Sequence, residues 1–238
     1  MSGCCKPNGY ERIFGAKQAR LDASRYRKRG LGGTSRGLVE LAGDVSGETV
    51  LEVGGGVGAI EVELLDAGAK RATNVELSGE YEEEAEKLLA EHGLRDRVDR
   101  RVADFVAEPV EVHDVVVMHR VVCCYPDVDR LIGLAAAATR RRMVLTYPRE
   151  RPWTRAGAAV INLFLRISGS DFRAFVHPVA RMRAAAEREG LALERRERPG
   201  VIWENAAYER LSTGGAGNGG SMEPRQRHDA SADEETQI

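Results

Sequence analysis

The segment from Thr49 to Gly68, TVLEVGGGVGAIEVELLDAG, most constrains the fold of this chain. Its first five residues are β-formers apart from Glu52, so they predict a buried strand. Glycines stand at positions 54, 55, 56 and 58, and apolar residues at helical spacing follow. Dense glycines let a ligand approach the backbone closely and direct free N–H groups at it from the start of a helix. A tight turn without a ligand rarely needs glycine so often, so we expect a ligand here.

Length and composition limit the kinds of protein that this chain can be. Its 238 residues suffice for one α/β domain with a sizeable core. A hydrophobic content of 42% is ordinary for a soluble protein, and a net charge of −2 gives no support for a nucleic-acid partner. The start of the chain lacks the apolar stretch of a signal peptide, and the longest apolar run, 156–165, is too short to span a bilayer. We therefore expect a cytoplasmic protein with no membrane span.

Strands and helices alternate along most of the chain. Apolar and β-branched runs predict strands at residues 49–53, 72–76, 98–102, 113–118, 143–147, 192–197 and 201–208. The alternation predicts a Rossmann-like, doubly wound α/β fold with a mostly parallel seven-stranded sheet and an antiparallel final strand. Two helices, at 16–29 and about 34–41, precede the first strand and form an N-terminal helical cap.

The chain divides into one domain and two flanking segments. We expect residues 1–15 to be a flexible N-terminus, 16–211 a single domain and 212–238 a disordered tail. Residues 149–177 interrupt the alternation with an apolar helix and aromatic side chains. An insertion after the fifth strand would lie near the carboxyl ends of the strands, where ligands of such sheets bind, and we expect a lid over the substrate. A core helix with ordinary packing aromatics is the alternative.

Two classes of ligand fit the glycine turn. Residues 54–59 match the dinucleotide pattern GxGxxA, and Glu76 stands where a ribose-binding acid belongs, which favours an NAD(P)-dependent dehydrogenase. Glu52 favours another ligand, because that position of a dinucleotide fold lies inside the first strand and is normally apolar. A carboxylate there suits a ligand whose neighbouring part is cationic or rich in donors. A non-catalytic cofactor-binding module is a third alternative.

Four segments resemble, in order and spacing, the motifs of the class I S-adenosylmethionine-dependent methyltransferases. They are LEVGGGVGAIEVELLDAGA, TNVELS, VADF and VVVMHRVVCCYPD, and the resemblance covers about residues 35–210. It implies an enzyme that uses S-adenosylmethionine as cofactor and transfers its methyl group to an acceptor by direct in-line displacement. The apolar insertion suits a small-molecule acceptor that is hydrophobic or planar. A fainter likeness is to carboxyl methyltransferases that act on tetrapyrroles.

The resemblance also implies which residues bind the cofactor. Glu52 and the turn with Gly54, Gly56 and Gly58 would hold its methionine part. Glu76, at the end of the second strand, would accept hydrogen bonds from both ribose hydroxyls. A plain strand-end charge is the alternative role for Glu76.

The later motifs supply the rest of the implied site. Asp104 would receive the adenine amino group with Phe105 beside the ring, although Asp104 could instead cap the turn that follows. His119 would face the cofactor and the substrate, and it is the candidate general base should the acceptor need one. The expected substrate contacts are Arg120, Tyr147 and Trp153.

The cysteines occur as two adjacent pairs. Cys4 and Cys5 stand near the start, and Cys123 and Cys124 follow the fourth strand. Neither pair has the spacing of a zinc site, so we expect no metal and reduced thiols. Arsenic-methylating relatives of the family hold their substrate with several thiols, and the alternative is that these cysteines only pack.

Overall fold

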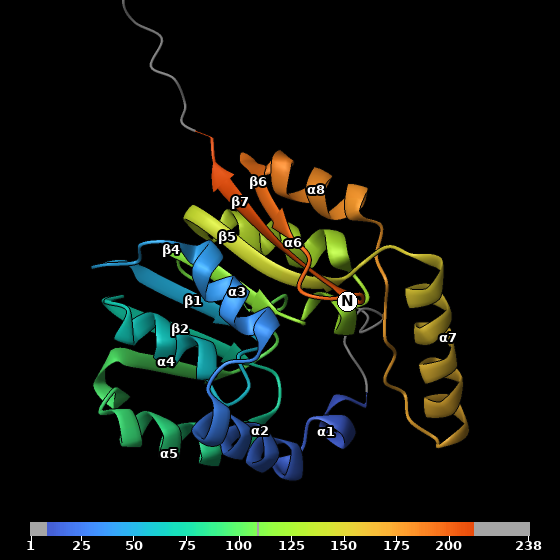
Figure 1. Ribbon diagram of the computed structural model, residues 1–238, viewed down its shortest axis with the longest axis horizontal. Helices are drawn as coiled ribbons and strands as arrows, with labels where there is room; N and C mark the ends of the chain where they lie inside the picture. Colours follow the sequence, from blue (N-terminus) through green and yellow to red (C-terminus); the bar gives the residue numbers. More distant parts are fainter. Residues whose placement is uncertain (1–8, 109, 212–238) are drawn as a thin grey trace, which may run out of the picture.

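The computed structural model describes residues 9–108 and 110–211 of the chain. A central sheet has helices on both of its faces (Figure 1). The strands are β1 (Thr49–Val53), β2 (Arg71–Glu76), β3 (Val98–Val102), β4 (His113–His119), β5 (Thr139–Pro148), β6 (Leu191–Glu197) and β7 (Trp203–Arg210). The α-helices are α1 (Tyr10–Ile13), α2 (Ala16–Arg29), α3 (Gly33–Ala42), α4 (Ala59–Asp66), α5 (Glu82–His92), α6 (Val128–Ala137), α7 (Pro152–Ile167) and α8 (Val179–Arg188).

The seven strands form one sheet in the order β3-β2-β1-β4-β5-β7-β6. The first five strands are parallel, and β7 runs antiparallel to both β5 and β6. This confirms the predicted fold, including the antiparallel final strand. The final strand is inserted between β5 and β6, so β6 forms the edge of the sheet.

The core lies on both faces of the sheet. The four residues from Val115 to Met118 are fully buried, with Val115 and Val117 in the core cluster beside α2–α5 and Val116 and Met118 in the other, beside α6 and α8. Burying a side chain of this size contributes about 1.5–3 kcal/mol. The uninterrupted valines therefore form a central strand that is covered on both faces, as their pattern predicts.

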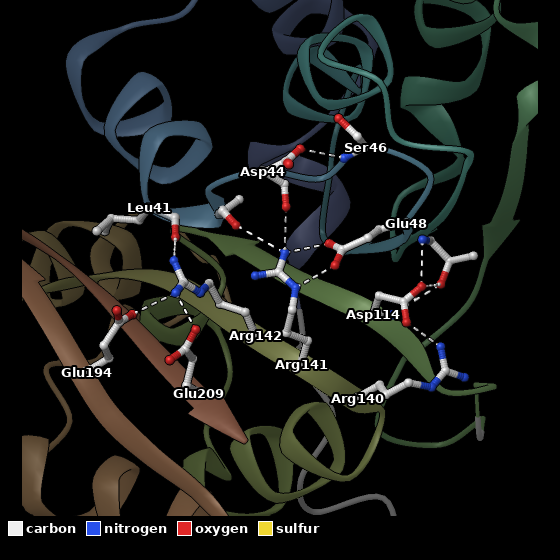
Figure 2. A network of polar contacts seen from close by, with 12 residues as sticks. Leu41, Asp44, Ser46, Glu48, Asp114, Arg140, Arg141, Arg142, Glu194 and Glu209 are labelled. Carbon is white, nitrogen blue, oxygen red and sulfur yellow. Dashed lines mark hydrogen bonds and ion pairs between the residues drawn. The ribbon is translucent and has the colours of Figure 1, made fainter. Parts of the chain in front are cut away.

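Strand β5 begins earlier than predicted and takes in three consecutive arginines (Figure 2). Arg140 pairs with Asp114, Arg141 with Glu48, and Arg142 with Glu194 and Glu209. Guanidinium groups of the same run also donate to backbone oxygens, with Arg142 Nη1 2.9 Å from the oxygen of Leu41. The basic run is therefore matched by carboxylates and carbonyls at the amino-terminal end of the sheet, and it forms no free positive patch.

The segment before α2 contains a short helix and a cluster of aromatic rings. Residues 9–15 contain α1, where the rings of Tyr10 and Phe14 stack with centroids 4.3 Å apart. Both rings also contact Phe172, at 6.4 and 5.8 Å. Aromatic contacts between distant segments order this part of the chain, and sequence periodicity does not show them. The predictions for residues 1–8 and 212–238 lie outside the described residues.

The insertion after β5 projects from the body of the molecule. Figure 1 shows α7 at its rim, with the returning segment 168–177 between α7 and the sheet. Asn162 ties α7 to this segment, because its side chain accepts from Ala174 N and donates to Ala174 O, both at 2.8 Å. Within the described ranges, no helix is long and apolar enough to cross a membrane.

Candidate functional site

A cavity of about 330 Å³ lies at the carboxyl ends of β1, β2 and β4. Its walls come from the glycine turn, from acids at the ends of strands, and from α1, α2 and the loop after α2. It is lined by Glu52, Gly54, Gly56, Glu76, His119 and Arg120 among the sequence-predicted residues. A smaller, mainly apolar cavity of about 40 Å³ adjoins it and shares Tyr10, Gly54, Val121 and Cys124 with it. Ligands of open α/β sheets bind at this edge.

The turn after β1 has a positive φ at two glycines that line the larger cavity. Gly54 has φ +66°, and a Cβ there would lie 2.6 Å from a methyl group of Val121. Gly56 has φ +56°, and a Cβ there would lie 3.2 Å from the ring of Tyr81. Gly58 lines neither cavity. It is the N-cap of α4, and its missing side chain leaves room for the carboxylate of Glu61.

Glu76 ends β2 with its carboxylate facing the glycine turn. The side chain is buried, and its Oε2 accepts from Gly56 N and its Oε1 from Ser78 N, both at 2.9 Å. Burial raises the pKa of Glu76, and the two backbone donors work against that rise. Each carboxylate oxygen retains a second lone pair. Glu76 is therefore an acceptor for two further donors at the cavity wall.

Glu52 is fully buried in β1 and accepts a hydrogen bond from Glu61 N at 3.0 Å. Burial, reinforced by the nearby carboxylate of Glu61, holds the pKa of Glu52 well above its usual range. Glu61 in turn accepts from Asn74 Nδ2 at 2.9 Å and from Arg100 Nη1 at 3.0 Å. A cation in the cavity would favour the ionised form of Glu52, because opposite charges lower the pKa of a carboxyl.

Arg100 of β3 donates a hydrogen bond to the glycine turn, a role that is not expected from the sequence. Its side chain is only 4% exposed, and its Nη2 donates to Gly56 O at 2.8 Å and to Glu82 at 2.8 Å. With Nη1 on Glu61, the guanidinium joins α4, α5 and the turn. A signal existed in the three charged residues of the motif VDRRV, but charge in a strand usually predicts solvent exposure.

Asp104 and Phe105 line the smaller cavity. Phe105 is buried, and Asp104 Oδ1 accepts from Val106 N at 3.0 Å. The hydroxyl of Tyr125 donates to the same carboxylate at 3.3 Å. Asp104 therefore stabilises the turn that follows it, which is the alternative role considered from the sequence, while its side chain also borders the apolar slot.

His119 and Arg120 meet at the hydroxyl of Thr34 in α3. His119 Nε2 and Arg120 Nη2 each lie 3.0 Å from Thr34 Oγ1. Burial, and then the charge of Arg120, lower the pKa of His119 to about 3, so its ring is neutral near pH 7. A guanidinium only donates, so the arrangement that uses every proton has Thr34 donating to Nε2 and the imidazole proton on Nδ1.

Arg120 is held in an unusual conformation. It has φ +60°, which is rare for a residue with a side chain, and its guanidinium lies 4.5 Å from the centroid of the Trp203 ring. Among the described residues this guanidinium forms no ion pair. Strain of this kind costs about 1–3 kcal/mol and persists where the surroundings enforce it. Arg120 therefore places a positive charge without a carboxylate partner at the cavity.

The structure brings Tyr147 and Trp153 to neither cavity. Tyr147 points into the core, where it is 1% exposed and donates to Glu204 Oε1 at 2.8 Å. Trp153 lies on α7 and is 53% exposed. The alternation of side chains along β5 turns Tyr147 away from the site, and α7 stands apart from the cavity.

Several lining residues come from segments in which sequence reasoning found no site. Helix α2 contributes Gln18, Asp22 and Arg25, and α1 contributes Tyr10 with Phe14 beside it. The α2 residues recur at intervals of four and three, which places them on one helix face and could have served as a signal. The aromatic residues of α1 follow no such pattern.

The thiols of Cys123 and Cys124 lie 3.7 Å apart beside the site. Cys123 Sγ donates to the oxygen of Arg120 at 3.1 Å, and Cys124 Sγ lies 3.5 Å from the same atom. Only Cys124 lines the cavities. These contacts are those of packing residues whose thiols also bond to the backbone at Arg120. Cys4 and Cys5, the other half of the substrate-holding hypothesis, lie outside the described residues.

Comparison with known proteins identifies the class. A family profile described as "Methyltransferase domain" matches residues 51–142. The structure of magnesium protoporphyrin IX methyltransferase from Synechocystis PCC 6803, with bound SAH, is 20% identical with a TM-score of 0.65, covering 84% of this chain and 97% of that one. An S-adenosylmethionine-dependent methyltransferase from Mesorhizobium loti is 16% identical with a TM-score of 0.59, covering 75% of this chain and 98% of that one. No curated protein matches the sequence.

The strand order and the profile match define a methyltransferase domain of Rossmann-like fold. Residues 51–142 therefore form a methyltransferase domain, and the chain shares the fold of S-adenosylmethionine-dependent methyltransferases, one of which was crystallised with bound SAH and with bound SAM. This confirms the family expected from the four motifs. A dinucleotide fold has parallel strands in the order 3-2-1-4-5-6, so the antiparallel β7 also disfavours the dehydrogenase alternative.

Proposed function

We propose that this chain transfers the methyl group of S-adenosylmethionine to a small-molecule acceptor, hydrophobic or planar, by direct in-line displacement. The observation that carries the proposal is the buried carboxylate of Glu76 in the cavity wall, bonded to the glycine turn beside an apolar slot. The bound sulfonium supplies an activated methyl group and a neutral thioether as leaving group. The protein then needs mainly to position the acceptor and exclude water.

The lining residues suit the successive parts of the cofactor. Glu76 would accept from the two ribose hydroxyls, and Asp104 and Phe105 would hold the adenine in the apolar slot. Glu52 and the glycine turn would face the methionine part. The wall also carries the ion pair of Asp22 with Arg25, at 3.0 Å, and Arg120, which forms no ion pair among the described residues. Acidic side chains outnumber basic ones in this wall, which favours a cofactor with a positive sulfur.

His119 has the role of a positioning residue in this proposal. A general base must accept a proton, but Nε2 already accepts from Thr34, and the pKa of about 3 makes the imidazole a poor acceptor near neutral pH. Its Nδ1–H is a donor for an oxygen of the acceptor. An acceptor that is already nucleophilic, such as a carboxylate, needs no base and suits this arrangement best.

The proposed acceptor class rests on the aromatic cover of the site. The rings of Tyr10, Phe14 and Phe172 pack together where α1 meets the returning segment, and the first two line the cavity. The ring of Trp203 packs against the guanidinium of Arg120. Aromatic faces bind flat apolar molecules, and a neighbouring guanidinium binds a carboxylate. A planar carboxylate would satisfy both features.

Thermal unfolding with S-adenosylhomocysteine, with NADH and without ligand tests the cofactor part. A ligand that binds only the folded state raises the melting temperature, so we expect a rise with S-adenosylhomocysteine and none with NADH. A response to NADH alone would refute the proposal. Formation of S-adenosylhomocysteine from S-adenosylmethionine, in the presence of a panel of aromatic carboxylates and phenols, tests the acceptor part. Turnover confined to small polar amines would contradict the proposed acceptor class.

A further inference from the structure

Helix α7 exposes apolar side chains that a folded protein ordinarily buries. Twelve large hydrophobic residues of the described chain are exposed, and half of them stand on this one helix. The six are Trp153, Val160, Ile161, Leu163, Phe164 and Ile167, which are 53–77% exposed. Single exposed apolar residues need no explanation, but a contiguous group marks an interaction surface.

Most of these residues form one stripe along the outer face of α7. Trp153, Val160, Phe164 and Ile167 are separated by seven, four and three residues, which is the spacing of a single helix face. The opposite face is held to the protein, because Thr154 is buried and Asn162 bonds to the returning segment. Figure 1 shows no other element on the outer side of α7. The stripe therefore faces outward along the whole helix.

The charges of α7 are all positive. Residues 152–167 contain Arg155 and Arg166 and no acidic residue. Arg166 forms no ion pair within the described part of the chain, and Arg155 pairs only with Glu150, before the helix. Arg149, Arg151 and Arg173 add further positive charge beside the helix ends, against Glu150 and Asp171. Basic residues beside an apolar face with tryptophan are typical of helices that lie in a membrane interface.

We propose that α7 docks this protein on a lipid surface that carries anionic headgroups. The stripe enters the boundary between headgroups and acyl chains, and the flanking guanidinium groups pair with phosphates. With 16 residues, α7 is shorter than the roughly 20 that a bilayer span requires, so it lies on the surface. The returning segment also carries Phe172 to the rings at the cavity, so a docked α7 places the site close to the lipid.

Charge also decides between a lipid surface and a second copy of this chain. Each copy of α7 carries Arg155 and Arg166 and no acidic residue, so two α7 helices packed through their stripes would bring two positively charged helices together. The helix offers no carboxylate to compensate them. A surface of anionic headgroups compensates all of the arginines together.

Sedimentation with vesicles tests this proposal on the full chain. We expect binding to vesicles of equal parts phosphatidylglycerol and phosphatidylcholine, and at least tenfold weaker binding to phosphatidylcholine alone. High salt should reduce binding to the anionic vesicles, since the guanidinium contribution is screened. The double variant V160E/F164E should bind at least about tenfold more weakly, because it removes two large apolar side chains from the buried stripe. R155Q/R166Q should lose about tenfold on anionic vesicles, with little change on neutral ones.

Val112→Glu is the matched control, since Val112 is 48% exposed and lies away from α7 before β4. It should bind vesicles like the unmodified protein. Circular dichroism and melting temperature show that each variant is folded. Absence of binding to anionic vesicles, or equal binding of V160E/F164E and V112E, would overturn the proposal. So would a concentration-dependent dimer in sedimentation velocity that V160E/F164E abolishes while vesicles bind neither protein.

Discussion

Two regions of the molecule use charge and apolar surface in opposite ways. One is the cavity wall at the ends of β1–β3, and the other is helix α7. Glu52 in the wall, and Glu61 and Arg100 behind it, are buried polar groups that bond to one another or to backbone. On α7, Phe164 is 69% exposed, and the arginines face solvent. The first arrangement holds a turn rigidly in one geometry, whereas the second leaves a face free to meet a partner. The proposed cofactor site and the proposed lipid-binding face thus lie on separate parts of one chain.

The largest expected effect is the loss of the buried guanidinium. Arg100→Gln should lower the free energy of unfolding by about 3–5 kcal/mol, because Glu61 would remain as a buried carboxylate without its partner. Arg101→Gln is the matched control, since the neighbouring side chain is 36% exposed and pairs with Asp99 and Glu111 at the surface. That change should cost less than about 1 kcal/mol. Equal losses of unfolding free energy in the two variants, measured in urea, would contradict this prediction.

A pair of identical substitutions compares the two regions directly. Phe105→Ala empties the apolar slot beside β3 and should cost about 3 kcal/mol in urea unfolding. Phe164→Ala on α7 should change the free energy of unfolding by less than about 0.5 kcal/mol, because that ring is already in solvent. A comparable loss in both variants would mean that α7 packs on the protein in solution.

Removing the carboxylate of Glu76 should weaken binding of S-adenosylhomocysteine by at least about a hundredfold. Two hydrogen bonds to a charged acceptor are each worth about 1.5–3 kcal/mol, and the glycine turn loses its bond from Gly56 N as well. Calorimetry on Glu76→Ala measures the change. Glu80→Ala, at an exposed position four residues later, should bind like the unmodified chain. Unchanged affinity of Glu76→Ala would remove Glu76 from the cofactor site.

The pH dependence of stability should report on Glu52. Its pKa in the folded protein is raised above 4.5, so the folded state binds the proton more tightly than the unfolded chain. The free energy of unfolding should therefore fall as the pH rises from 4.5 through the raised value, by up to about 1.4 kcal/mol per pH unit for this group. Glu52→Gln should reduce the slope by that amount. An unaltered slope in urea unfolding from pH 4.5 to 7 would show that Glu52 is ionised throughout.

The smallest expected effect is the absence of a titration. With a pKa of about 3, the ring of His119 should give the same nitrogen and carbon NMR shifts from pH 5 to pH 8. The ¹⁵N shifts should also identify Nε2 as the unprotonated nitrogen, as the bond with Thr34 requires. Thr34→Val should change these shifts and leave the fold intact. A titration near pH 6.5 would restore His119 as a candidate base.

The sequence predicts the fold well because the signals that set it are local. The valines of β4 and the glycines after β1 specify a buried strand and a turn without reference to the rest of the chain. The position of Glu76, the last residue of β2, can be predicted in the same way, because the carboxyl ends of parallel strands meet at one edge of the sheet. Glu76 therefore reaches the larger cavity, as do Glu52 and His119, and Asp104 reaches the smaller one.

The remainder of the site depends on partners that are distant in the sequence. Arg100 appears in the sequence as a surface charge, and only the meeting of α4, α5 and the turn makes its burial possible. Tyr10 and Phe14 reach the cavity through contacts with Phe172, more than 150 residues away. Tyr147 is expected from the sequence to contact the substrate, but its side chain lies in the core. Neighbouring residues of a strand point to opposite faces of the sheet, so a shift of one residue decides which face a side chain reaches.

The bond between Asn205 Nδ2 and Thr34 O, at 2.9 Å, joins residues that are 171 positions apart. Thr34 also holds His119 and Arg120, so this side of the cavity is assembled around a residue whose own support comes from β7. During synthesis at about 5–20 residues per second, roughly 9–34 s separate the two partners. The growing chain can form β1 to β5 in that interval, but the side of the cavity at His119 and Arg120 is completed only when β7 has been made. A ribosome-bound chain that lacks β7 should therefore hold the glycine turn without a finished place for the acceptor.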